Sequence, residues 1–351
     1  MRIAVVFRDP PPRSERAGAV RLRRLAAALD DRGHEVRIYC LPWWETSGRR
    51  IDIDGLEHEG VTFEHPALYY SRLPGLLLRY GPDLVVASAD PPGAVLSAWL
   101  GARLARVPLF VDWYGDEPDV AESGWVGSAS SLPTRVVTPS EHQRTRVREY
   151  GASEATTTVV PDGIDFPTIT ATDPGERVDV AFAARLDDDS NLEDLLLGLA
   201  ELREAGEWTA TVIGDGPERA AFETQARDLR LGDRVEFVGD CPREERVAIY
   251  RGAHTFVQTA RRQSFAGELL WALACGCVGV VELQGDSSAH ELVERRDRGI
   301  RVTDPDALDD AISESWTFGF RDVDTAFQGF DHAAVTGQYV ELFREAGVDA
   351  R

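Results

Sequence analysis

The chain has 351 residues, which is too long for one ordinary hydrophobic core and predicts two domains. Its 60 acidic residues outnumber its 38 basic ones, giving a formal net charge of −22 that argues against a nucleic-acid partner. No apolar stretch is long enough to span a bilayer and no secretory signal is visible, so we expect a cytoplasmic protein.

Every basic residue of the chain is an arginine, because the sequence contains no lysine. A genome rich in G and C would favour arginine over lysine but would not by itself produce the acidity. An acidic, lysine-free surface is typical of proteins from salt-saturated cytoplasm, where screening relieves the repulsion between carboxylates. The composition therefore predicts a halophilic, archaeal source.

The first half of the chain alternates strand-like and helix-like segments. Short continuous apolar strands flanked by helices are typical of a parallel sheet. The predicted strands cover residues 2–7, 33–39, 82–87, 108–111 and 134–138, and the predicted helices cover residues 18–32 and 140–150.

Residues 166–177, rich in proline and threonine, are the best linker candidate, and the alternation restarts after them. Strands are predicted at residues 178–183, 209–214, 235–238 and 254–257, and helices at residues 191–205 and 217–229. The chain is predicted to be helical beyond Asp304. We therefore expect an α/β protein with two Rossmann-like domains, residues 1–165 and 177–330, and a ligand cleft between them. Residues 331–351 are expected to form a helix that packs back toward the first domain.

A loop, a helix and a short strand follow one another in residues 259–281. The polar residues 261–264 lead into an apolar helix, Cys275 and Gly276 end it, and a β-branched run follows. The free N–H groups at the start of such a helix are suited to binding an anion.

Five further motifs accompany this unit in a fixed order. They are Ala17-Gly18 with residues 32–36, Pro161-Asp-Gly-Ile-Asp165, Ala184-Arg-Leu186, Gly214-Asp-Gly-Pro-Glu218 and residues 234–239. Together the motifs resemble those of the retaining glycosyltransferases of family 4, over nearly the whole chain. The resemblance implies the GT-B fold, and transfer of a sugar from a nucleotide-diphosphate donor to the hydroxyl of a glycan or lipid-linked acceptor. It implies no metal and no cofactor beyond the donor substrate.

The resemblance also implies which residues bind the donor. In the family, the arginine matching Arg185 neutralises the donor diphosphate, and a lysine stands where this chain has Ser190. Arg261 and Arg262 either replace that cation or form a solvated pair. The full set of predicted donor-binding residues is Gly18, Arg185, Ser190, Gly214, Gly216, Arg262, Ser264, Phe265, Glu268 and Trp271.

The chain departs from the family at the two glutamates of its Glu-x7-Glu motif, which are Gln263 and Trp271 here. An amide keeps hydrogen bonding without the charge, whereas an indole cannot accept hydrogen bonds from ribose hydroxyls. Glu268, three residues before Trp271, either reaches the ribose or only stabilises the start of its helix. Ser264 is predicted to cap that helix and to contact phosphate.

These departures leave a second function open, a non-catalytic protein that binds a sugar nucleotide or a partner enzyme. A nicotinamide-dependent dehydrogenase is disfavoured, because the first strand leads into Arg8-Asp-Pro-Pro-Pro12 rather than a glycine-rich turn.

Two charged segments belong to the predicted first domain. Asp112 and Asp116 follow a strand at the ligand-binding edge and either position or deprotonate the acceptor, or belong to a solvated loop. Arg185, Gln263, Asp112 and Asp116 are thus the predicted catalytic residues. Six arginines in residues 8–24, with the leucine-rich residues 72–79, either contact an anionic membrane or phosphorylated acceptor, or only aid solubility.

Overall fold

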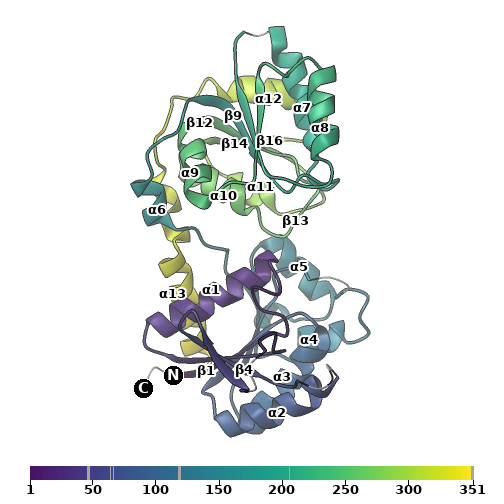
Figure 1. Cartoon of the computed structure of the whole chain (residues 1–351), viewed down its shortest axis with the longest axis vertical. Coiled ribbons are helices and arrows are strands. Elements are labelled where there is room, and N and C mark those ends of the chain that lie inside the picture. The colour runs from purple at the N-terminus through teal and green to yellow at the C-terminus, as the bar shows by residue number, and fades with distance from the viewer. Residues whose placement is uncertain (46–47, 64, 66, 118–119, 205, 349–351) are drawn as a thin grey trace. The chain divides into compact units, whose positions relative to one another are not determined.

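The computed structural model describes residues 1–45, 48–63, 65, 67–117, 120–204 and 206–348 (Figure 1). Two compact units make up the chain: unit 1 contains Met1–Asp162 and Ala333–Arg351, and unit 2 contains Gly163–His332. The C-terminal helix α13 (His332–Glu345) therefore belongs mainly to unit 1. Residue 205 of a predicted helix and residues 349–351 of the predicted C-terminal segment lie outside the described residues.

Unit 1 is built on an eight-stranded sheet with the order β3-β4-β2-β1-β5-β6-β7-β8. Neighbouring strands are parallel except for the antiparallel pair of β3 and β4. The strands are β1 (Arg2–Val6), β2 (Glu35–Cys40), β3 (Arg50–Ile53), β4 (Leu56–Gly60), β5 (Leu84–Ser88), β6 (Leu109–Asp112), β7 (Arg135–Thr138) and β8 (Thr157–Val159). With α13, the helices are α1 (Ala17–Asp31), α2 (Leu68–Tyr80), α3 (Pro92–Ala105), α4 (Val126–Ser131), α5 (Glu141–Glu149) and η1 (Glu154–Thr156).

Helices cover both faces of this sheet, which explains why consecutive residues of its central strands are apolar, except at strand ends such as Arg2, Ser88 and Asp112. Along β1, Ile3 and Val5 pack in a cluster with residues of α1 and α13, while Ala4 and Val6 pack in a cluster with residues of α2 and α3. Successive side chains of a strand point to opposite faces, so a sheet covered on both sides needs apolar residues throughout. Figure 1 shows α1 and α13, from the two ends of the chain, side by side.

Unit 2 contains a six-stranded parallel sheet with the order β11-β10-β9-β12-β14-β16 and a small parallel pair, β13-β15. The strands are β9 (Val178–Ala183), β10 (Ala210–Ile213), β11 (Val235–Gly239), β12 (Ala253–Gln258), β13 (Arg262–Gln263), β14 (Val278–Glu282), β15 (Asp286–Ser287) and β16 (Gly299–Val302). The helices are α6 (Phe166–Ala171), α7 (Leu192–Glu201), η2 (Leu202–Glu204), α8 (Arg219–Asp228), α9 (Arg243–Gly252), α10 (Gly267–Ala274), α11 (Ala289–Val293), η3 (Pro305–Ala307), α12 (Leu308–Ser315) and η4 (Thr325–Phe330).

The prediction that residues 166–177 form a linker is wrong at its start, where helix α6 stands. The Asp165 carboxylate accepts a hydrogen bond from the Thr168 N–H at 3.1 Å, and Pro167 occupies the first turn. An aspartate cap followed by proline is a strong helix start. Phe166 and Ile169 are buried, and the segment belongs to unit 2, where α6 contacts α9.

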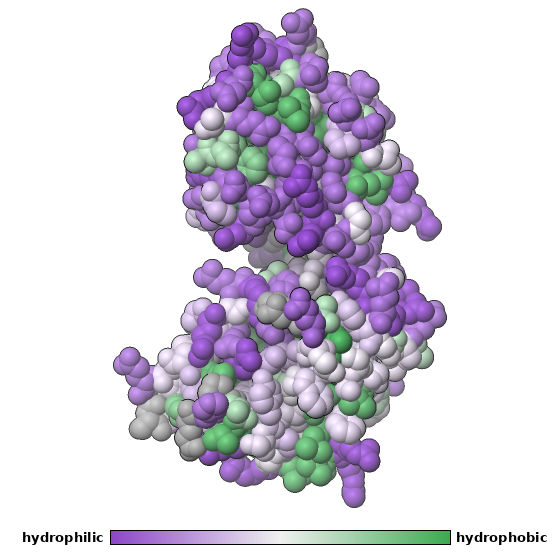
Figure 2. All heavy atoms as spheres, turned by 90° about the vertical axis from the view of Figure 1, so that its right-hand side faces the viewer, coloured by the Kyte–Doolittle hydropathy of each residue, from purple (hydrophilic) through white to green (hydrophobic). Residues whose placement is uncertain are grey.

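The predicted membrane contact at residues 72–79 is also not supported, because that segment lies in α2 with its leucines turned inward. Leu73, Leu76 and Leu77 are buried, and only Leu78 of the four leucines is exposed. None of the described helices combines the length and apolar character needed to cross a membrane. On the face shown in Figure 2, hydrophilic residues predominate and hydrophobic ones form small separate groups.

A buried ion pair joins α1, β6 and α13 inside unit 1. Arg21 Nε lies 3.2 Å from Asp112 Oδ2, and both side chains are almost fully buried. The Tyr339 hydroxyl of α13 donates to the same carboxylate oxygen and accepts from Arg21. Arg21 also donates to the Val160 carbonyl at 2.8 Å. The network therefore fixes the C-terminal helix on the sheet.

Removing the carboxylate of this network is expected to destabilise the protein strongly. Asp112→Ala leaves Arg21 as a buried unpaired cation, which costs roughly 3–5 kcal/mol of unfolding free energy. Asp54→Asn is the matched control, because Asp54 pairs with Arg23 of the same helix at the exposed surface. Asparagine tolerates the φ of +52° at this position, so losing the pair should cost only about 0–1 kcal/mol. Urea titrations measure both values, and equal losses would contradict the assignment. Adding Arg21→Met to Asp112→Ala should recover part of the loss.

Candidate functional site

Two glycines lock a loop of unit 2 at the carboxyl edge of its sheet, where open α/β sheets bind ligands. Gly214 follows β10 with φ of +123°, and a Cβ atom there would lie 1.9 Å from the Ala184 carbonyl oxygen. At Gly216 a Cβ atom would lie 2.2 Å from the Leu186 carbonyl oxygen. Only glycine allows this backbone approach. The loop that carries Arg185 is therefore held in a fixed position.

Arg185 and Arg262 are strongly exposed cations at this edge. The Arg185 side chain is 75% exposed with Nε 3.3 Å from Asp187, and the Arg262 side chain is 71% exposed with Nε 3.8 Å from Asp189. Such exposed pairs contribute only about 0–1 kcal/mol, so an anionic ligand can replace them. Arg261 is more firmly engaged, because it donates to a Glu193 carboxylate at 2.6 Å and to a backbone carbonyl.

Ser190, which stands at the lysine position of the family, is buried and turned into its own loop. Its hydroxyl donates to the Asp187 carbonyl at 2.6 Å, and its carbonyl accepts from Thr259 at 3.0 Å. The serine therefore shapes the loop between Arg185 and α7. It supplies no charge to the edge.

A buried polar cluster that the sequence analysis missed lies at the same edge. Asn191 Nδ2 donates to Asp194 at 2.8 Å and to Glu282 at 3.2 Å. Burial and the neighbouring Asp194 carboxylate raise the pKa of Glu282 to about 7. Glu282 directly follows the apolar residues 278–281 of β14, and an acid at the end of a buried strand is the signal that could have revealed it.

Gln263 lies in β13, and its side chain is paired within the unit. The Gln263 Oε1 atom accepts a hydrogen bond from Gln258 Nε2 at 2.8 Å, and the backbone of Gln263 pairs with β15. The amide thus takes a partner from the end of β12, at the same edge as Arg185.

The predicted capping role of Ser264 is wrong. Helix α10 begins after Ala266, which occupies the N-cap position in place of Ser264 and makes no capping hydrogen bond through its side chain. Gly267 N–H bonds the Phe265 carbonyl at 3.0 Å, so the chain makes an extra tight turn between Ser264 and the helix. Phe265 is buried and anchors that turn.

Glu268 and Trp271 of α10 pack against α9. The Glu268 carboxylate accepts hydrogen bonds from Arg243 at 2.9 Å, Arg246 at 3.0 Å and the Tyr250 hydroxyl at 2.7 Å. Burial opposes its charge, but Arg243 and the other donors outweigh burial and lower the pKa of Glu268. Trp271 is buried, with the Arg243 guanidinium 4.8 Å from its ring centre. Both side chains are thus committed to the contact between the two helices.

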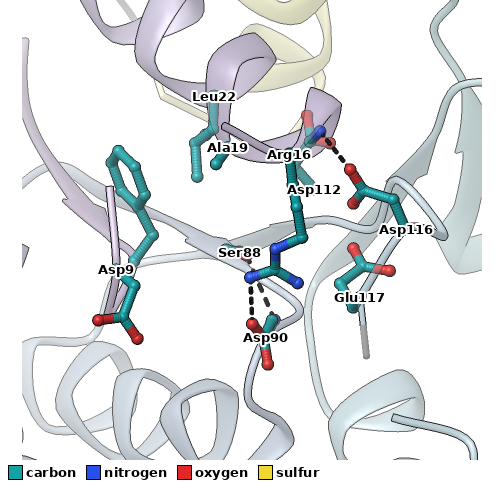
Figure 3. A pocket seen from close by; sticks show the side chains of 11 residues that line it. Asp9, Arg16, Ala19, Leu22, Ser88, Asp90, Asp112, Asp116 and Glu117 are labelled. Carbon is teal, nitrogen blue, oxygen red and sulfur yellow. Dashed lines mark hydrogen bonds and ion pairs between the residues drawn. The ribbon is translucent and has the colours of Figure 1, made fainter. Parts of the chain in front are cut away.

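Unit 1 contains a small carboxylate-lined pocket at the carboxyl edge of its own sheet (Figure 3). Gly18 at the start of α1 donates its N–H to Asp116 at 2.9 Å, and a Cβ atom on Gly18 would lie 2.8 Å from that carboxylate. The Arg16 side chain extends across the pocket to Asp90. The predicted residues Gly18 and Asp116 are therefore in direct contact. Asp112 also lines the pocket, with its Oδ2 atom engaged by Arg21 and Tyr339.

Glu117 is a second candidate in this pocket that was not selected from the sequence. Its carboxylate accepts hydrogen bonds from the backbone N–H groups of Tyr114 at 2.9 Å and Gly115 at 2.8 Å. Burial of the carboxyl group and the adjacent Asp116 raise the pKa of Glu117 to about 8. Burial also raises the pKa of Asp116. Glu117 can therefore hold or release a proton near neutral pH.

The arginines of residues 8–24 do not form a free basic surface, because each one pairs with a carboxylate of unit 1. The pairs are Arg8–Asp9, Arg13–Asp9, Arg16–Asp90, Arg21–Asp112, Arg23–Asp54 and Arg24–Asp162. The expectation of a basic patch for a membrane or phosphorylated acceptor is therefore not supported by the geometry.

Two family models match the chain. The model described as glycosyl transferases group 1 matches residues 171–315, and the glycosyl transferase 4-like domain matches residues 16–163. The chain belongs to the group 1, family 4-like glycosyltransferases. Together the two matches cover most of the chain, one in each unit.

Similar proteins agree with this family. The 2-deoxystreptamine glucosyltransferase of Streptomyces kanamyceticus is 27% identical over 143 residues, which is 36% of this chain and only 37% of that protein. A glycosyltransferase from Rickettsia africae is similar in structure with a TM-score of 0.78, 13% identity and 99% coverage of both chains. Anabaena HepE in complex with UDP has a TM-score of 0.75 and 18% identity, covering 98% of this chain and all of that one. These structures confirm the predicted GT-B fold.

The raised pKa of Glu117 makes stability depend on pH. Folded Glu117 keeps its proton up to about pH 8, whereas the unfolded side chain loses it near 4.5. Between these values the native state binds more protons, so the unfolding free energy falls as pH rises, by at most about 1.4 kcal/mol per pH unit. Glu117→Gln should make this decline shallower between pH 5 and 8 in urea titrations at constant salt, while Glu282 and Asp116 still contribute to it. The exposed Glu122→Gln variant should follow the unmodified protein, and parallel curves for all three proteins would contradict the assignment.

Proposed function

We propose that this protein is a retaining glycosyltransferase that moves a sugar from a nucleotide-diphosphate donor to an acceptor hydroxyl. The observation that carries the proposal is the loop of Arg185, whose backbone Gly214 and Gly216 hold at the carboxyl edge of the unit 2 sheet. The Arg185 side chain itself is exposed and forms only a weak ion pair with Asp187. In a chain of net charge −22, an exposed guanidinium on a loop of fixed backbone can attract an anion.

The proposed role of this edge is to stabilise the leaving diphosphate. Negative charge develops on the diphosphate as the sugar departs, and cations placed in advance lower the barrier. Arg185 and Arg262 can each offer two parallel N–H donors to phosphate oxygens. Relatives support this donor class, since one solved structure contains UDP and another UDP-glucose.

We assign acceptor binding to the carboxylate pocket of unit 1. Asp116 and Glu117 are the candidates for positioning the acceptor hydroxyl, because Asp112 is engaged by Arg21 inside the unit. A carboxyl group with a pKa of about 8 can accept or hold a proton at the pH of the reaction. A glycan or a lipid-linked sugar supplies the hydroxyl in this proposal.

One observation favours a second function, a donor-binding protein without transfer activity. Gln263 and Trp271 replace the two family glutamates, and the nearby Glu268 is neutralised by Arg243 and Arg246. No described carboxylate of α10 is therefore left to bind ribose. Release of nucleoside diphosphate distinguishes the two functions.

The test is to incubate the protein in molar KCl with UDP-glucose, UDP-galactose, ADP-glucose and GDP-mannose. We expect at least one donor to release its nucleoside diphosphate, with transfer to an added acceptor glycan and retained anomeric configuration by NMR. Binding without release from any donor would favour the second function. Neither binding nor release would contradict both.

Arginine variants test the donor site itself. Arg185→Ala and Arg262→Ala should each weaken nucleoside-diphosphate binding roughly tenfold or more, because a hydrogen bond to a charged group contributes about 1.5–3 kcal/mol. The control is Arg203→Ala, which removes an exposed arginine of η2. Titration calorimetry measures the three affinities. Equal affinity in Arg185→Ala and Arg203→Ala would contradict the proposed site.

A further inference from the structure

A second arginine-rich pocket lies at the opposite edge of the unit 2 sheet. Its volume is about 210 Å³, below the roughly 300–1,000 Å³ of sites for drug-sized ligands, so it suits a compact ligand. It is bounded by the end of α10, the residues just before β14 and β16, and the start of η4. Because Glu282 ends β14 at the donor edge whereas Cys277 precedes it here, the two sites lie at different ends of one strand.

The charge of this pocket is the reverse of the charge of the whole chain. Four arginines and two aspartates line it, namely Arg295, Arg296, Arg298, Arg321, Asp297 and Asp324. Arg321 pairs with Asp324. Within the described part of the chain, the other three arginines have no carboxylate within ion-pair distance. In a protein with 60 acidic residues, three neighbouring unpaired arginines are an unusual concentration of positive charge.

Two of these arginines are held in place by contacts other than ion pairs. The Arg296 guanidinium lies over the buried Phe327 ring, 4.0 Å from its centre. Arg298 donates to the carbonyls of Gly319 at 2.7 Å and Gly276 at 3.0 Å, and its Nε atom is buried without a hydrogen-bond partner. Stacking leaves the N–H donors at the guanidinium edge available to a ligand.

The surroundings of Arg296 and Arg298 disfavour the charged form of both side chains. Burial lowers the pKa of Arg296, and burial together with Arg321 lowers the pKa of Arg298. A partly buried cation without a carboxylate reduces stability, and an anion in the pocket would remove that penalty.

We propose that this pocket binds the phosphate group of a small ligand, through the guanidinium groups of Arg296 and Arg298 with Arg295 at its rim. Planar guanidinium groups pair with phosphate oxygens through two parallel hydrogen bonds. The site is separate from the donor edge and does not rest on the proposed transfer reaction. A free phosphorylated metabolite and a phospholipid head group offer the same chemistry.

The first experiment titrates inorganic phosphate into the full chain by calorimetry, in potassium acetate at constant ionic strength and neutral pH. Saturable binding is expected. Arg296→Gln should weaken it roughly tenfold, because it removes one charge-assisted pair. Arg295→Gln provides a second variant at an exposed position, where folding is not at risk, and it should weaken binding in the same direction.

Arg301→Gln is the matched control, because it removes one exposed arginine from β16, outside the pocket lining. It should bind phosphate like the unmodified protein. Absence of saturable binding, no effect of Arg296→Gln, or an equal effect of Arg301→Gln would each overturn the proposal.

A vesicle experiment distinguishes the two sources of phosphate. The protein is sedimented with phosphatidylcholine vesicles that contain or lack phosphatidic acid. Sedimentation that requires phosphatidic acid and is lost in Arg296→Gln but kept in Arg301→Gln would assign a lipid head group. Phosphate binding in calorimetry without such sedimentation would assign a soluble ligand.

Discussion

Carboxylates outnumber guanidinium groups in this chain, and this imbalance determines how each arginine is used. With 60 acidic residues and 38 arginines, each arginine side chain has many carboxylates available as ion-pair partners. The arginines of residues 8–24 illustrate this, since all six have carboxylate partners within unit 1. The most deeply buried of them, Arg21, joins α1 to Asp112 and Tyr339 and so holds the C-terminal helix in place. The arginines that lack a close carboxylate partner are therefore the best candidates for binding an anionic ligand.

Such arginines occur at both edges of the unit 2 sheet. At the carboxyl edge, Arg185 and Arg262 are exposed and only loosely paired, beside backbone that two glycines hold rigidly. At the amino edge, Arg296 and Arg298 are positioned by an aromatic ring and by carbonyl groups rather than by carboxylates. The first edge fits the diphosphate of a sugar donor. The second has no role in that chemistry, which is why we assign it a separate phosphate ligand.

Local patterns in the sequence were sufficient to predict the fold. Continuous apolar runs marked the central strands, and α1 was predicted to within one residue of its bounds. The hairpin of β3 and β4 was not predicted, because residues 50–60 carry too many charged side chains to read as strands. Helix α6 was missed because proline and threonine suggested a linker, although Asp165 and Pro167 are a helix start. Residues 316–324, predicted as helical, contain no helix.

The candidate site was predicted less completely, because its chemistry depends on contacts between distant residues. The sequence shows Arg185 within the Ala184-Arg-Leu186 motif, and that local pattern was enough to propose it for the donor site. It cannot show that Asp112 meets Tyr339, 227 residues away, or that Glu268 meets Arg243 and Arg246. The raised pKa values of Glu117 and Glu282 likewise follow from burial, which depends on the folded environment.

The central claim is that the glycine-locked edge of unit 2 holds the donor diphosphate without the usual carboxylates. A crystal structure of the protein with UDP, or with whichever nucleoside diphosphate binds most tightly, tests it most directly. We predict that the phosphate oxygens lie within hydrogen-bond distance of Arg185 and of the backbone at Gly214–Gly216. A diphosphate bound elsewhere, with Arg185 still paired to Asp187, would contradict the claim.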